Sequence, residues 1–138
     1  MPSSFGDTLS GMSDPGPAIR WKKDVADHDF EAAEAFLSIR LTPENAKRLV
    51  GRLKDASLTE RRANDILRAC RREPLPLNDP GVLRDLVKLA SGEKLSPVLV
   101  VSFDEVADIA DGYHRVSLAY ALDPFAAVPL RIASFSSR

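Results

Sequence analysis

The stretch IADGYHRV, residues 109–116, decides the fold because it joins a strand to a helix through one glycine. Ile109 and Ala110 end a short run that favours a β-strand, and Gly112 supplies the turn. A helix is expected from about His114 to Leu122. A strand and a helix in direct succession indicate a sheet with helices packed on it.

Strands are also expected on both sides of this stretch. Residues 97–101 form a β-branched apolar run after a proline, which is typical of a buried strand. Residues 107–110 are expected to return beside it, and residues 128–133 to form a third strand. Residues 75–77 are interpreted as a brief extended piece.

A helix is predicted between these strands, starting at Asp79-Pro80 and stopping at Gly92. Its buried face is expected to consist of Leu83, Leu86, Val87 and Ala90.

Three helices are predicted before Pro74. The first carries Phe30, Ala33, Phe36 and Leu37 on one face. The second starts at Thr42-Pro43, a capping hydroxyl followed by a proline, and buries Ala46, Leu49, Val50 and Leu53. The third has Ser57 and Glu60 as a capping box and an apolar stripe of Ala63, Ile66, Leu67 and Cys70. The last two are expected to form an antiparallel pair.

The fold class that follows is α+β, a small mixed β-sheet with helices, preceded by an N-terminal helical element. Of the first 18 residues, ten are Ser, Pro or Gly, which is typical of a flexible segment. We expect a flexible tail over 1–24, the helical element over 25–73 and the α+β domain over 74–138. At 138 residues, one core is the expectation.

Composition excludes several classes of protein. Cys70 is the single cysteine, so there is no internal disulfide framework and no cysteine-rich zinc site. No apolar run approaches the ~18 residues of a membrane span, and the amino terminus lacks the apolar core of a signal peptide. We expect a cytoplasmic protein of bacterial type with no membrane partner. No metal site is assigned, and with two histidines and one cysteine any bound metal would have to rely on carboxylates.

The net charge of −1 hides a basic segment. Residues 40–72 hold ten bases and four acids, whereas both flanking segments are acidic. An alternative function is therefore a non-catalytic nucleic-acid- or protein-binding module that uses these helices. Its expected contacts are Arg61, Arg62 and Arg68.

The turn at Gly112 has the chemistry of an anion site. The first amides of a helix lack intrahelical partners, and the helix dipole is positive there. Arg115 can grip two phosphate oxygens, and His114 can donate a hydrogen bond or move a proton. Asp111 is a candidate base or metal ligand, and Ser117 lies one turn further on. The candidate catalytic residues are His114 and Asp111, and the candidate ligand-binding residues are Gly112, His114, Arg115 and Ser117.

Asp-Gly-x-His-Arg between a strand and a helix resembles the ParB/sulfiredoxin fold, over about residues 74–133. Residues 75–77 look like the family's first strand, residues 95–101 like its strand of a proline followed by β-branched residues, and residues 128–132 like its closing strand. The resemblance implies binding of nucleotide phosphates at this turn, with ATP or CTP and Mg²⁺ as possible cofactors.

The chain departs from two branches of that family. Sulfiredoxins carry a catalytic cysteine directly before the His-Arg pair, where this chain has Tyr113. ParB partition proteins have a Gly-Glu-Arg-Arg turn and continue into a DNA-binding helix-turn-helix. The expected function is therefore binding of a nucleotide or another phosphorylated ligand at the Asp111–Arg115 turn. Phosphoryl transfer or hydrolysis is the expected class if the protein is an enzyme, a point the sequence leaves open.

Overall fold

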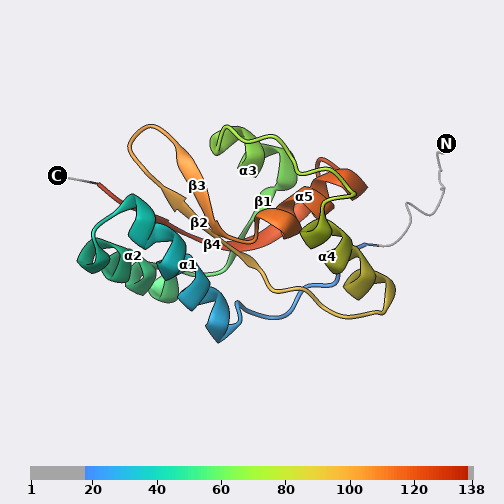
Figure 1. Ribbon diagram of the computed structural model, residues 1–138, viewed down its shortest axis with the longest axis horizontal. Helices are drawn as coiled ribbons and strands as arrows, with labels where there is room; N and C mark the ends of the chain where they lie inside the picture. Colours follow the sequence, from blue (N-terminus) through green and yellow to red (C-terminus); the bar gives the residue numbers. More distant parts are fainter. Residues whose placement is uncertain (1–17, 137–138) are drawn as a thin grey trace.

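The computed structural model describes residues 18–136 (Figure 1). Within this range the chain forms five helices and four strands, which confirms the predicted α+β class. In chain order they are α1 (Asp27–Arg40), α2 (Pro43–Asp55), β1 (Thr59–Arg62), α3 (Ala63–Ala69), α4 (Pro80–Ala90), β2 (Val98–Ser102), β3 (Ala107–Asp111), α5 (Tyr113–Leu122) and β4 (Ala127–Ser134).

The four strands form one mixed sheet in the order β1-β4-β2-β3. β2 and β3 are antiparallel neighbours, as the sequence predicts, with Val100 opposite Ile109. β4 lies parallel to β2, with Val98 opposite Leu130. β1 pairs antiparallel with β4 at the outer edge. One strand from the N-terminal half of the chain thus belongs to the same sheet as the three from the C-terminal half.

Helices cover both faces of the sheet (Figure 1). Because side chains alternate along a strand, Leu99 and Val101 of β2 pack with α1 and α2, whereas Val98 and Val100 pack with α3 and α5. α4 packs on α5 through a smaller cluster that contains Val82 and Leu118. The core is therefore two apolar layers separated by the sheet.

The predicted start signals of two helices and the predicted stop signal of one are confirmed. Thr42 accepts a hydrogen bond from the backbone of Asn45 and caps α2. Asp79 caps α4 in the same way. Gly92, with φ +82°, follows the end of α4, where its backbone conformation favours glycine.

The predicted antiparallel pair of helices within residues 40–72 is wrong. The predicted capping box of Ser57 and Glu60 does not start a helix, because residues 59–62 form β1 and pair with residues 127–130 of β4. α2 packs on one face of the sheet and α3 on the other, so β1 carries the chain between the two layers. The backbone hydrogen bonds of the sheet edge take the place of the capping box. The apolar stripe of α3 is confirmed as Ala63, Ile66, Leu67 and Cys70.

The predicted inner face of α4 is wrong in part, because only Leu86 of its four residues packs against the core. Leu83 and Val87 are exposed, and the buried residues of the helix are Gly81, Val82, Asp85 and Leu89. Residues 75–77 form no strand, because prolines at 74 and 76 have no amide hydrogen for a ladder and the amide of Leu75 bonds to a side chain.

The segment expected to be a flexible tail, 1–24, falls partly outside the described residues, which begin at 18. Residues 20–24 are fixed to the fold. The amide of Lys22 donates to the carbonyl of Leu95 at 2.8 Å, and Asp24 pairs with Arg131 at 2.6 Å. None of the helices in residues 18–136 is long and apolar enough to cross a membrane.

Candidate functional site

Gly112 forms the turn between β3 and α5, and only glycine fits there. Its φ of +112° is a conformation that L residues rarely adopt. A β-carbon at this position would lie 2.4 Å from Cγ1 of Val98 and 2.9 Å from Nη2 of Arg115. Glycine has no side chain to cap the helix, so the first amides of α5 have no side-chain acceptor from the cap position.

His114 lies where the starts of α4 and α5 meet. Its ring rests directly on Gly81, where a β-carbon would come within 2.3 Å of the imidazole Cδ2. Its Nε2 is 3.5 Å from Oδ2 of Asp79, the oxygen that also accepts from the amides of Gly81 and Val82. The side chain is 51% exposed. The imidazole is thus held in place on one side and open to solvent on the other.

Arg115 points inward and forms ion pairs with two carboxylates. Its Nη2 lies 2.8 Å from Oδ2 of Asp111 and 3.6 Å from Oδ2 of Asp29, and its side chain is only 16% exposed. The shorter contact is a hydrogen bond. The planar fork that was expected to grip a ligand is therefore occupied by Asp111, which ties the end of β3 to the first turn of α5.

Acidic groups outnumber the cation in this buried region. Burial raises the pKa of Asp111 above its usual value even though Arg115 lowers it. Burial likewise raises the pKa of Asp85 on α4. Oδ2 of Asp29 and Nε of Arg115 are buried and have no hydrogen-bond partner among the described residues. Arg115 therefore offsets only part of the cost of burying these carboxylates.

The structure brings together most of the residues that the sequence singled out. Gly112, His114, Arg115 and Asp111 lie in one turn of chain. Ser117 does not join them, because it is fully buried and its hydroxyl accepts the amide of Leu75 at 2.9 Å. Its observed role is to fix residue 75 against α5.

Three residues of this region were missed in the sequence. Asp29 lies four residues before Ala33, on the apolar face of α1, and its spacing is a signal that it is buried. Asp85 lies between Val82 and Leu89 on the inner face of α4, with the same kind of spacing. Nothing in the spacing links Gly81 to an imidazole 33 residues further along the chain.

The other candidate residues lie elsewhere. Arg61 and Arg62 are exposed on β1, and Arg68 is exposed on α3. Cys70 is buried beside α3, and burial raises the pKa of its thiol to about 11, so it is a core residue as predicted.

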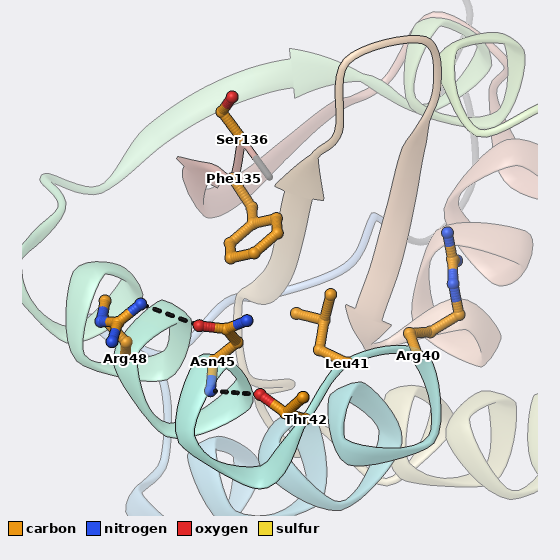
Figure 2. A pocket seen from close by; sticks show the side chains of 7 residues that line it. All are labelled: Arg40, Leu41, Thr42, Asn45, Arg48, Phe135 and Ser136. Carbon is orange, nitrogen blue, oxygen red and sulfur yellow. Dashed lines mark hydrogen bonds between the residues drawn. The ribbon is translucent and has the colours of Figure 1, made fainter. Parts of the chain in front are cut away.

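A separate cavity of about 380 Å³ lies between the turn that joins α1 to α2 and the end of β4 (Figure 2). Two arginines line it, but Figure 2 shows Arg40 and Arg48 on opposite sides of Leu41 and Asn45. Arg48 donates to the side chain of Asn45, and Arg40 pairs with the buried Asp108. The two cations do not converge on one point, so the cavity is a weak anion site.

Within residues 18–136, no three His, Cys, Asp or Glu side chains are grouped as metal ligands. Comparison with protein-family models, with curated proteins and with solved structures finds no match for this chain.

Proposed function

We propose that the start of α5 binds the phosphate group of a small phosphorylated ligand. The observation that supports this most is the position of His114, an exposed imidazole held beside the uncapped first turn of a helix. Backbone amides and a histidine together supply several hydrogen-bond donors and a positive dipole at one point. This is the chemistry that a phosphate group requires.

The proposal gives Arg115 a positioning role. Because its guanidinium is bonded to Asp111, Arg115 fixes the turn, and the ligand is contacted by the backbone amides and His114. Asp79 orients His114 and at the same time caps α4. The carboxylate of Asp79 already accepts hydrogen bonds from the first amides of α4. The first amides of α5 have no such side-chain acceptor, so the N-terminus of α5 is the one that can bind an anion.

A nucleotide is the first ligand to test, because the turn resembles that of the ParB/sulfiredoxin fold. The described residues offer no ready-made cage for a magnesium ion. Mg²⁺ is commonly held by one or two carboxylates together with substrate phosphates, so it would arrive with the nucleotide. If the phosphoryl group is transferred, His114 is the exposed side chain that can donate or accept the proton. Asp111 acts indirectly, because its hydrogen bond to Arg115 fixes the turn that carries His114.

The test is a thermal-shift and calorimetric screen of ATP, CTP, their diphosphates and inorganic phosphate, with and without Mg²⁺. A ligand at about 100 times its dissociation constant should stabilise the protein by about 2.7 kcal/mol. His114→Ala should weaken binding by about tenfold, the loss of one hydrogen bond to a charged group. Gly81→Ala should weaken it as well, since the added methyl group displaces the imidazole.

His28→Ala is the matched control, because His28 is the other histidine and its side chain is 80% exposed. It should bind as the wild type does. If none of the phosphorylated compounds shifts the melting temperature, or if His114→Ala and His28→Ala bind equally well, the proposal is wrong.

A further inference from the structure

A second cavity, of about 390 Å³, lies between α3 and α5 and is rich in arginine. Its volume falls within the range of small-ligand sites. The polar and aromatic side chains that line it are Asn64, Arg68, Arg71, Arg72, Glu73 and Tyr120. Three positive groups face one negative group, so the cavity favours an anion.

The arginines at this cavity differ in how firmly they are held. Arg72 is partly committed, since it lies 3.4 Å from the buried Asp108 and over the ring of Tyr113. Arg68 contacts Asp65 at 3.6 Å, and Arg71 donates to the carbonyl of Glu105 at 3.5 Å. The hydrogen bond of Arg71 is at the outer limit of length, the ion pair of Arg68 is long, and both are exposed to solvent. Arg68 and Arg71 can therefore turn to a ligand at little cost.

The backbone at Arg71 is the unusual feature of this region. It has φ +53°, and it is the one non-glycine residue of the described chain in that conformation. The position follows the end of α3, where glycine is the usual residue. A basic residue after a helix interacts favourably with the negative end of the helix dipole, but Arg68 in the last turn of α3 makes that interaction without a positive φ. The backbone therefore holds Arg71 beside the cavity at a cost in conformational free energy.

An exposed aromatic ring lies at the other end of α3. Phe125 is 62% exposed, and the guanidinium of Arg62 lies 5.8 Å from its ring centre. The turn that carries Phe125 is joined to the start of α3, where the amide of Asn64 donates to the carbonyl of Pro124 at 2.9 Å. Asn64 also lines the cavity. The turn that carries Phe125 is thus hydrogen-bonded to a residue that lines the arginine cavity.

We propose that this surface, defined by Arg62, Phe125, Arg68, Arg71 and Tyr120, binds single-stranded nucleic acid. Phe125 offers a face on which a base stacks, and Arg68 and Arg71 receive a backbone phosphate in the cavity beside Tyr120. Sequence-tolerant binding of single strands combines these two elements, an aromatic platform and a cationic groove. The sequence showed basic residues without an aromatic among them, and the fold supplies the ring from the turn between α5 and β4.

The test is fluorescence anisotropy with labelled single-stranded DNA and RNA of about 12 nucleotides. Phe125→Ala should weaken binding by about tenfold, because it removes one stacking platform. Arg71→Gly should also weaken binding, and should reduce the slope of log K against log salt by about 0.7, one phosphate contact. Glycine is favoured at this position, so Arg71→Gly should melt at or above the temperature of the wild type, and its loss of binding cannot be attributed to unfolding.

Arg48→Ala is the matched control, because it removes the same charge from α2 on the opposite face of the sheet. It should keep the binding of the wild type, as should His114→Ala, which separates this surface from the phosphate site. The absence of binding at low salt would overturn the proposal. Equal affinity for duplex and single strand would also overturn it. So would equal losses of affinity in Arg48→Ala and Arg71→Gly, because either result indicates attraction to the net charge alone. Nucleoside monophosphates bound as tightly as strands would show a small-molecule site instead.

Discussion

Asp111 and Arg115 form a 2.8 Å ion pair that spans the turn at Gly112, from the last residue of β3 to the first turn of α5. The same nitrogen of Arg115 lies 3.6 Å from Asp29 on α1. One guanidinium therefore links a strand, the helix that follows it and a helix from the other end of the chain. These two ion pairs tie the turn to α1, and a site built from backbone amides requires that kind of support.

Arg115→Ala should destabilise the protein by about 3 kcal/mol. The loss arises because Asp29 and Asp111 would remain buried without their cation. Urea denaturation measures it, and Arg48→Ala, at an exposed position, should change stability by less than about 0.5 kcal/mol. Equal stability of the two variants would mean that water already screens the pair.

Gly112→Ala should destabilise the protein by about 3 kcal/mol, because it combines a left-handed backbone with a collision against Val98. Gly51 offers a matched comparison, since it lies within α2 and nothing lies within 4 Å of the position of its missing β-carbon. Gly51→Ala should therefore stabilise by about 0.5–1 kcal/mol. The two variants should move the melting temperature in opposite directions, and a shift of the same sign would contradict the observed geometry of the turn.

Asp85→Asn should stabilise the protein at neutral pH. Burial raises the pKa of Asp85 in the folded state, so the folded chain binds this proton more tightly than the unfolded chain does. Between the raised pKa of the folded state and the ordinary pKa of the unfolded state, the free energy of unfolding rises as pH falls. At neutral pH the buried carboxylate is ionised and destabilises the fold. The difference between variant and wild type should shrink as pH falls through the raised pKa toward about 4, the ordinary value.

Urea denaturation as a function of pH measures this effect. Asp104→Asn, at an exposed position in the loop between β2 and β3, is the control and should follow the wild type at every pH. A stabilisation of Asp85→Asn that stays constant as pH falls would show that the carboxylate is not the cause.

Arg71→Gly should be more stable than Arg71→Ala by about 1 kcal/mol, because alanine keeps the strain of a positive φ and glycine does not. Both variants lack the guanidinium and should lose the proposed nucleic-acid binding to the same extent. Thermal unfolding and anisotropy, measured on the same samples, test the two statements. Alanine and glycine variants of equal stability would show that the backbone at this position is not strained.

Local sequence signals identified most of the elements. The strands around residues 98–101, 107–110 and 128–133 and the helix after Gly112 are where the pattern placed them, because β-branched runs, prolines and glycines act over a few residues. The prediction from sequence was wrong where a partner far along the chain determines the secondary structure. Ser57 and Glu60 have the spacing of a capping box, but the edge of β4 offers the backbone of residues 59–62 a ladder of hydrogen bonds.

The inner face of α4 shows the same limit. Four apolar residues at helical spacing predicted Leu83 and Val87 inside, yet Asp85 occupies the buried side. The attraction of Arg115 lowers the cost of burying that carboxylate, and Gly81 on the same side makes room for His114. No property of residues 80–90 alone contains this information.

The sequence by itself determined the α+β class, the strand-glycine-helix turn and the residues of that turn, because short-range backbone preferences govern each of them. Only the tertiary structure decided what those residues contact. Asp111 forms an ion pair with Arg115, and the ring of His114 packs against Gly81. Ser117 is buried in the core, and Phe125 lies beside Arg62. These contacts join segments up to 63 residues apart or depend on the packing of whole helices, and packing is a property of the complete chain.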